Sequence, residues 1–169
     1  QQTRVEAVKP YFERFMAAFP DIKALAEADD DYLMKMWEGL GYYNRARNLK
    51  AAAIMVMEEF CGQIPAAKEE LLKLPGIGSY TAGAISSIAY GVPNPAVDGN
   101  VLRVLSRLWG DTSDIKKASV KAAMEQEIAE VMPENAASSY NQGLIEIGAL
   151  VCIPGGEPKC SECPLASLC

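Results

Sequence analysis

Residues 71–85 read LLKLPGIGSYTAGAI, with two glycines between helical patterns. Leu71, Leu72 and Leu74 share a helix-like face before the glycines, and small and apolar residues follow them. Gly76 and Gly78 allow backbone angles that a β-carbon disfavours, which predicts a tight hairpin between two helices. Backbone N–H groups at the start of the second helix, from Gly78 and Ser79 onward, can converge on one phosphate. A plain turn between helices fits the stretch equally well.

Other glycine-rich phosphate sites do not fit this hairpin. A P-loop needs Gly-Lys-Ser or Gly-Lys-Thr after the glycines, and a dinucleotide fold needs a strand before them. The sequence has neither feature.

Helical periodicity extends through most of the chain, with apolar residues recurring every three or four positions. No run shows the sustained alternation of a strand, so we predict an all-α protein. The expected helices cover 5–19, 29–38, 45–60, 67–74, 79–89, 101–108, 115–131 and 136–151.

The charge and composition exclude several classes of function. The 169 residues carry a net charge of −6, which argues against binding nucleic acid through a broad basic surface. The sequence contains no His, so imidazole metal sites and His-dependent catalysis are excluded. No apolar run has the length of a membrane span, and no signal peptide is visible.

Four cysteines at the end of the sequence indicate a metal site. Cys152, Cys160, Cys163 and Cys169 have the spacing C-x7-C-x2-C-x5-C. Four thiolates without His favour a 4Fe–4S cluster, with zinc as the second choice and two disulfides as a third. Cys61 stands apart from this group, and we expect it to be buried.

Asp98, in AVDGNVLRVLSRL, precedes a strongly amphipathic helix. An Asp at this position is most often an N-cap. A carboxylate at the start of a helix can also stabilise a developing cation or attack it. Spacing alone leaves both interpretations open.

The ordered set LPGIGSYTAGA, AVDGNVLRVLSRL and the four-cysteine tail resembles the helix-hairpin-helix DNA glycosylases. Three further stretches, QQTRVEAV, WEGLGYYNRARNL and NQGLIEIGALVC, are similar to the MutY-type adenine DNA glycosylases. The resemblance covers essentially the whole chain. It implies a six-helix barrel lobe over 1–92, with the hairpin at about 71–90, and a helical lobe over 93–169 that ends in a 4Fe–4S loop at 152–169.

The resemblance also implies a function in base excision repair. Family members bind double-stranded DNA, extrude an adenine mispaired with 8-oxoguanine or guanine, and hydrolyse its glycosidic bond. We expect such a protein to be monomeric and, in a prokaryote, to lie in the cytoplasm with the nucleoid. Two alternatives are an endonuclease III-like glycosylase and lyase for oxidised pyrimidines, and a non-catalytic iron–sulfur DNA-binding module.

Three positions match the family's active site. Asp98 matches the aspartate that stabilises or captures the cationic sugar, and Asn100 matches a neighbour that orders the site. Tyr80 occupies the position at which endonuclease III enzymes carry the Schiff-base lysine, and a phenol cannot form that imine. A ring packed into the helix after the hairpin fits Tyr80 as well.

The segment WEGLGYYNRARN matches the loop that enters the base stack. The resemblance makes Tyr42 the intercalating residue with Leu40 beside it, and Arg45 and Arg47 are candidate phosphate contacts or solvated charges. Gln2 and Thr3 match residues near the lesion, and an amide can pair with base edges. Without the resemblance, Gln2 and Thr3 would be interpreted only as a frayed terminus. Trp37 would be interpreted as a core residue.

The sequence departs from the family pattern in three respects. The family's catalytic Glu precedes the Gln-Gln-Thr motif, so we interpret the chain, which opens at Gln1 without Met, as a core fragment of low activity. We also expect the family's C-terminal 8-oxoguanine-reading domain to lie beyond it. The first cysteine gap has seven residues where the family usually has six, and Gly155 and Gly156 can absorb the difference.

Overall fold

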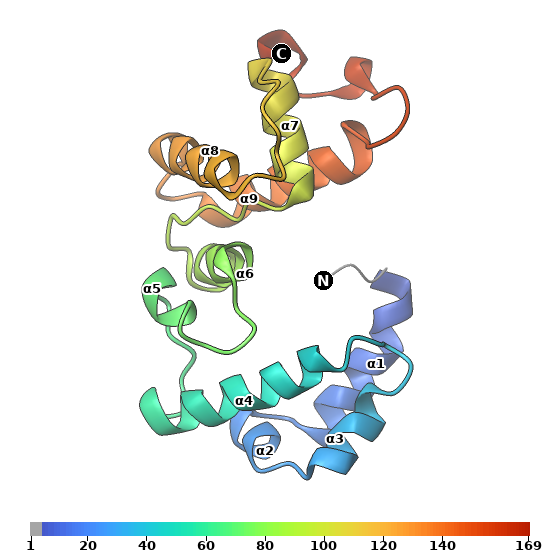
Figure 1. Ribbon diagram of the computed structural model, residues 1–169, viewed down its shortest axis with the longest axis vertical. Helices are drawn as coiled ribbons and strands as arrows, with labels where there is room; N and C mark the ends of the chain where they lie inside the picture. The colour runs from blue at the N-terminus through green and yellow to red at the C-terminus, as the bar shows by residue number, and fades with distance from the viewer. Residues whose placement is uncertain (1–4) are drawn as a thin grey trace. The chain divides into compact units, whose positions relative to one another are not determined.

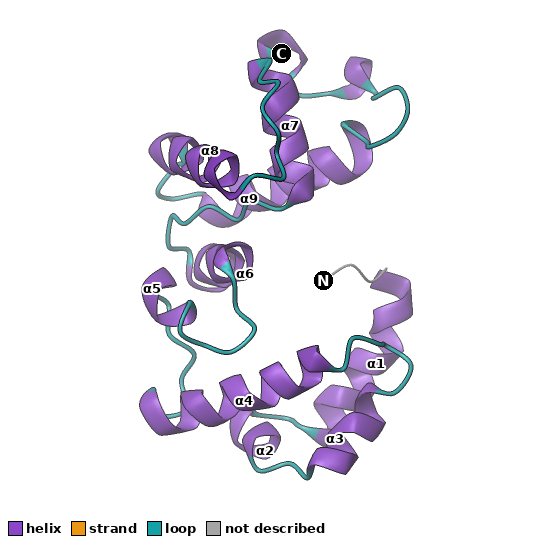
Figure 2. Cartoon of the chain, in the orientation of Figure 1, coloured by secondary structure: helices purple, strands orange, loops and turns teal. Residues whose placement is uncertain are grey.

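The computed structural model describes residues 5–169, and every regular element in that range is helical (Figures 1 and 2). The prediction of an all-α protein is therefore confirmed. None of the helices in this range combines the length and apolar character needed to cross a membrane. The elements are α1 (Val5–Ala18), α2 (Ile22–Ala26), α3 (Asp30–Trp37), α4 (Asn44–Glu59), α5 (Lys68–Leu71), α6 (Ser79–Ala84), η1 (Ile85–Ala89), α7 (Gly99–Trp109), α8 (Ala118–Val131), α9 (Ala137–Glu146), η2 (Ile147–Val151), η3 (Cys160–Glu162) and η4 (Ala166–Leu168).

The predicted helices differ from the observed ones in two ways. Sequence periodicity missed α2, whose five residues are too short to show a period. The predicted helices 79–89 and 136–151 each finish as a π-helix, η1 and η2. π-Helical turns are rare and are often found at functional sites.

The described chain forms two compact units. The first comprises residues 1–65 and 70–77, and the second comprises 66–69 and 78–169. Residues 78–92 thus belong to the second unit, whereas the sequence analysis grouped them with the first lobe. The boundary between the two lobes, at residues 92 and 93, stays a prediction, because the two compact units need not be the same as the two lobes of the family fold.

The first unit has an aromatic and aliphatic core formed by α1 to α4. Phe19, Leu25 and Leu33 are buried there beside small residues of α4. Phe15 makes edge-to-face contacts with Phe19 at 4.9 Å and with Trp37 at 5.9 Å between ring centroids. Trp37 is accordingly a core residue, as the sequence predicted.

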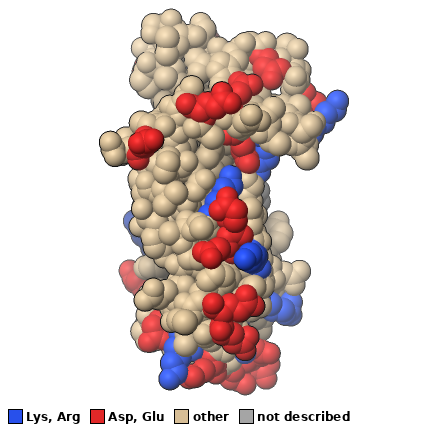
Figure 3. Space-filling view, turned by 90° about the vertical axis from the view of Figure 1, so that its left-hand side faces the viewer, with Lys and Arg blue, Asp and Glu red and all other residues tan. Residues whose placement is uncertain are grey.

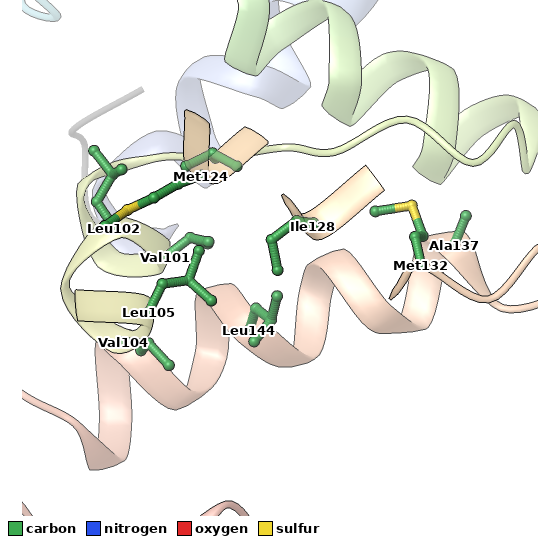
Figure 4. Packing of buried hydrophobic residues seen from close by; sticks show 10 residues of the cluster. Val101, Leu102, Val104, Leu105, Met124, Ile128, Met132, Ala137 and Leu144 are labelled. Carbon is green, nitrogen blue, oxygen red and sulfur yellow. The ribbon is translucent and has the colours of Figure 1, made fainter. Parts of the chain in front are cut away.

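The second unit has its core between α7, α8 and α9 (Figure 4). Val101 and Leu105 on α7 point toward Ile128 of α8 and Leu144 of α9, and Leu102 lies beside Met124 of α8. The apolar face predicted for residues 101–108 is therefore the buried face, and it fixes the start of α7 against the rest of the unit.

A buried polar network holds the segment that leads into α7. The backbone N–H of Ala96 donates to Asn141 Oδ1 at 3.0 Å, and Asn141 Nδ2 donates to Ser87 Oγ at 2.7 Å and to the Asn94 carbonyl at 2.8 Å. Ser87 Oγ donates to the Gly83 carbonyl at 2.7 Å. These bonds join the segment before Asp98 to both η1 and α9, and they leave the buried amide of Asn141 fully paired.

The same segment passes directly over Gly83. A β-carbon at Gly83 would lie 1.8 Å from the Pro95 carbonyl oxygen, a distance that no side chain tolerates. Gly83 lies inside a helix, where glycine costs about 1 kcal/mol relative to alanine, so its presence reflects this close approach.

We expect Gly83→Ala to lower the free energy of unfolding by about 1–3 kcal/mol, because the segment 94–97 must move away from the helix. The measurement is chemical denaturation followed by far-UV circular dichroism. Gly143→Ala is the matched control: it lies inside α9 with nothing within 4 Å of the added carbon, so it should stabilise by up to about 1 kcal/mol. Equal stability of the two variants would show that the close approach is not a constraint.

Candidate functional site

Asp98 begins α7 as its N-cap. Its Oδ1 accepts hydrogen bonds from the backbone N–H groups of Asn100 at 2.8 Å and Val101 at 2.9 Å. Its Oδ2 accepts a third bond from the side-chain Nδ2 of Asn100 at 2.9 Å. The half-buried carboxylate is thus held in one orientation at the positive end of the helix dipole.

These contacts make the cap and the active-site interpretations of Asp98 compatible. An N-cap carboxylate that also accepts from a side-chain amide has little freedom to rotate, and an oriented carboxylate is suited to stabilise a cation placed near it. Asn100 contacts Asp98 directly, as an ordering neighbour should. The catalytic roles of both residues stay predictions.

Tyr80 lies in the first turn of α6, close enough to Asp98 for the carboxylate to affect its ionisation. Burial raises the pKa of the Tyr80 phenol, and the negative charge of Asp98 raises that pKa further. The phenol is therefore neutral at neutral pH. Tyr80 is half-buried, so it is both a packed ring and a neighbour of the candidate carboxylate.

Arg103 connects the start of α7 to the segment that contains the first terminal cysteine. Its Nη2 donates to Asn100 Oδ1 at 3.0 Å and to the Gly148 carbonyl at 2.6 Å. Its Nε donates to the Cys152 carbonyl at 2.9 Å. A β-carbon at Gly148 would lie 2.6 Å from Asn100 Cβ, so η2 and α7 touch at this point.

The four terminal cysteines are not paired in disulfides. Arg107 Nη1 donates to Cys152 Sγ at 3.2 Å and to the Ile153 carbonyl at 3.1 Å, and Cys169 Sγ lies 3.7 Å from the Arg107 carbonyl. Cys160 is the first residue of the short helix η3, and Cys163 is its C-cap. Cys61 lies outside this tail and is exposed, with a left-handed backbone (φ 53°), so the expectation that it is buried was wrong.

The donor set suits an iron–sulfur cluster, because its ligands are soft thiolates and the tail holds four of them. Within residues 5–169, however, no three Cys, Asp or Glu side chains form a group that could hold a metal ion. The chemistry of the tail therefore fits a cluster.

The predicted hairpin contains a boundary between the two compact units along the sequence, because Ile77 is the last residue of the first unit and Gly78 belongs to the second. Gly76 has a left-handed backbone (φ 78°), and a β-carbon there would lie 2.8 Å from Asn48 Cβ. Gly78 is extended (φ −99°), so only Gly76 uses the freedom predicted for both.

Ser79 makes a contact that the sequence did not suggest. Its Oγ lies 2.6 and 2.7 Å from the two carboxylate oxygens of Glu125 in α8. Lys68 and Lys121 lie 3.8 and 4.0 Å from the same carboxylate. The side chain of Ser79, a predicted DNA-contacting residue, is thus bonded to the Glu125 carboxylate of α8.

The loop between α3 and α4 exposes Tyr42, whose side chain is 79% accessible, while Leu40 is half-buried. The two candidate arginines differ in their surroundings. Arg45 lies against the rings of Trp37 and Tyr42. Arg47 donates to Asn44 Oδ1 at 3.0 Å and borders a pocket of about 430 Å³ that also contains acidic side chains. Gln2 and Thr3 lie outside the described residues.

The surface charge agrees with the acidic composition. On the face drawn in Figure 3, acidic and basic side chains are interspersed, and the described residues form no broad basic patch there. This face therefore offers no broad basic surface to a polyanion.

Several residues of the site escaped sequence reasoning. Asn141 and Glu125 look like ordinary polar positions on helices, and only the fold places them against Ala96 and Ser79. A usable signal did exist for Gly83 and Gly148, because a glycine inside a helical pattern indicates a close packing contact.

Comparisons with known proteins agree with these motifs. A family model described as "HhH-GPD superfamily base excision DNA repair protein" matches residues 1–130. The chain is 39% identical over 169 residues to an adenine DNA glycosylase of Buchnera aphidicola (subspecies Schizaphis graminum), covering 100% of this chain and 48% of that protein. It is 41% identical over 170 residues to the adenine DNA glycosylase of Homo sapiens, covering 100% and 31% respectively. The chain thus spans about half or less of the length of these relatives.

Solved structures of related DNA repair enzymes have the same fold. A thermostable thymine-DNA glycosylase superposes with a TM-score of 0.88 at 26% identity, covering 100% of this chain and 77% of that one. An endonuclease III in a non-covalent DNA complex superposes with a TM-score of 0.82 at 29% identity, covering 99% and 77%. The expected fold class, a helix-hairpin-helix DNA glycosylase, is confirmed, and the chain belongs to the HhH-GPD superfamily of base excision DNA repair proteins.

Proposed function

We propose that this chain is the catalytic core of an adenine DNA glycosylase, which hydrolyses the N-glycosidic bond of adenine opposite 8-oxoguanine or guanine. The observation that carries the proposal is the Asp98 carboxylate, oriented by three hydrogen-bond donors next to a neutral Tyr80. The adenine DNA glycosylases that resemble the chain over its whole length support the choice of base.

In this mechanism Asp98 acts on the sugar. As the bond to adenine breaks, positive charge develops on the deoxyribose, and a fixed carboxylate stabilises that charge without having to reorient. Asn100 and the first backbone N–H groups of α7 keep the carboxylate aimed. Water then attacks the sugar carbon to complete hydrolysis. The proton for the departing adenine is predicted to come from a Glu upstream of Gln1.

Tyr80 supports a hydrolytic enzyme without lyase activity. A lyase of this superfamily needs an amine that attacks the sugar and forms an imine, and a phenol offers no such chemistry. The raised pKa of Tyr80 keeps it neutral, so it lines the site next to Asp98 as an uncharged hydroxyl.

The partner is double-stranded DNA, bound by a monomer through local contacts. The backbone N–H groups that follow Gly76 and Gly78 supply an uncharged phosphate site, which suits an acidic protein. The exposed ring of Tyr42 enters the base stack as the adenine leaves it. In a prokaryote this places the protein with the nucleoid.

The cofactor of the proposed enzyme is a 4Fe–4S cluster held by Cys152, Cys160, Cys163 and Cys169. When bound, such a cluster would cross-link the C-terminal tail. Its role would be structural, because glycosidic hydrolysis transfers no electrons. Arg107 and Arg103 already hold the Cys152 segment against α7 in the protein chain itself.

Asp98→Asn should reduce single-turnover adenine release from an A:8-oxoguanine duplex on the order of 10²–10³-fold and leave duplex binding intact. Asparagine remains a good N-cap, so stability should change little. The assay uses the chain as it stands and a version extended N-terminally with the corresponding segment of a relative. Asp111→Asn is the control, because the exposed Asp111 also accepts a backbone N–H and lies in the same unit. If Asp98→Asn retained full activity in the extended protein, the proposed function would fail.

Incubation with the same duplex and sodium borohydride should give no covalent protein–DNA adduct, because Tyr80 cannot form a reducible imine. Denaturing gel electrophoresis resolves such an adduct. Endonuclease III, which acts through an imine, is the positive control on an oxidised-pyrimidine duplex. An adduct with either duplex would assign lyase activity to this chain.

Reconstitution with iron and sulfide should give visible absorbance and about four iron atoms per chain. Cys160→Ser should lower the iron content sharply, whereas Cys61→Ser, which changes an exposed cysteine outside the tail, should leave it unchanged. Chelation of the bound iron should make residues 152–169 sensitive to protease. Binding of zinc with no iron, or equal effects of the two substitutions, would contradict the cluster assignment.

A further inference from the structure

Residues 38–43, here called the wedge loop, join α3 to α4 and hold an aromatic side chain in an unusual backbone conformation. Gly39, Gly41 and Tyr42 have left-handed backbones, with φ of 94°, 67° and 49°. Glycine adopts such angles freely, but tyrosine rarely does. The surrounding contacts must therefore keep Tyr42 in this conformation while its ring is exposed to solvent.

Arg45 contacts this loop and its border through both its side chain and its backbone. Its guanidinium carbon lies 5.5 Å from the ring centroid of Trp37 and 5.6 Å from that of Tyr42. Both distances are within the range of cation–π attraction. Its Nη2 also donates to the Leu40 carbonyl at 3.3 Å, and its backbone N–H donates to the Tyr42 carbonyl at 2.9 Å.

Trp37 connects this arrangement to the core of the first unit. Its indole Nε1 donates to the Gly41 carbonyl at 3.0 Å, and its ring packs edge-to-face on Phe15. The Leu40 N–H donates to the Trp37 carbonyl at 3.1 Å. The loop is thus bonded to a half-buried aromatic residue that packs against the core, and Arg45 links that residue to the exposed Tyr42.

We propose that Arg45 is a positioning residue for Tyr42: its guanidinium, in contact with both rings and bonded to the Leu40 carbonyl, orders the wedge loop before DNA arrives. The inference rests on the proposed function, because an ordered wedge matters only to a protein that extrudes a base. Pre-ordering removes part of the entropy cost of inserting the ring. Arg45 then contributes more to extrusion of the adenine than to the affinity of the protein for DNA.

This role differs from the phosphate contact that the sequence suggested for Arg45. A phosphate contact contributes to binding of paired and single-stranded DNA alike, and lysine can replace arginine as a point charge. A positioning residue acts only where a base must be forced out of a duplex. Lysine lacks the planar fork that meets two rings and a carbonyl together, so it should rescue poorly.

The test measures wild type, Arg45→Gln and Arg45→Lys on a duplex with 2-aminopurine at the target position, whose fluorescence rises when the base leaves the stack. We expect wild-type and variant proteins to bind the duplex similarly, and the extrusion rate to fall roughly tenfold to a hundredfold in both variants. Binding to single-stranded DNA, where no base must be extruded, should be unchanged. Amide exchange should become faster at Leu40 and Arg45, whose N–H groups are bonded at the loop.

Lys23→Gln is the control: it removes one positive charge from the same unit at an exposed ion pair remote in sequence from the loop. It should change neither fluorescence nor exchange. Equal losses of duplex and single-strand binding in Arg45→Gln, with rescue by lysine and unchanged exchange, would overturn the inference and make Arg45 a phosphate contact. A wild-type protein that binds the duplex with no rise in fluorescence would overturn the proposed function together with the wedge.

Discussion

The contact between the Pro95 carbonyl and Gly83 is the constraint on which the candidate site depends. Asp98 lies three residues beyond Pro95, so its position is set by how the segment 94–97 crosses the helix below it. Asn141 completes the restraint by bonding the same segment from α9. Hydrophobic burial of α7 then fixes the direction in which the chain continues. Even an alanine at position 83 would displace this segment, because its β-carbon would occupy the space of the Pro95 carbonyl.

Hydrogen bonds connect the Asp98 carboxylate to the segment that contains Cys152 in the second unit. Asn100 donates to Asp98 and accepts from Arg103, and Arg103 continues to the carbonyl groups of Gly148 and Cys152. The Asn100 amide is therefore held by Asp98 on one side and by Arg103 on the other, and the Arg103 guanidinium is held by Asn100 and the two carbonyl groups. The helix end supplies the remaining donors to Asp98. Among the described residues, amide groups alone thus orient the Asp98 carboxylate.

Local features of the site were predictable from sequence, and contacts between distant segments were not. The helical periodicity, the cap at Asp98 and the cysteine tail each depend on neighbours within a few residues, and the structure shows the first two as expected. The bond between Ser79 and Glu125 spans 46 positions and has no sequence signal. For Arg45 the sequence left open a phosphate contact and a solvated charge, and its position against the Trp37 ring had no sequence signal. Cys61 was misjudged because thiols are usually buried, while its turn places it at the surface.

The partner that each glycine touches determines whether a second change elsewhere can compensate for its replacement. A β-carbon at Gly62 would approach the side chain of Met57 at 3.3 Å, and a smaller or more flexible neighbour could relieve that contact, leaving the strain of the left-handed backbone (φ 76°). At Gly83 the obstacle is a main-chain oxygen, which every amino acid at position 95 would retain. No substitution of Pro95 can therefore compensate for the replacement of Gly83. An effort to diversify or stabilise this protein should treat position 83 as fixed and seek variation elsewhere.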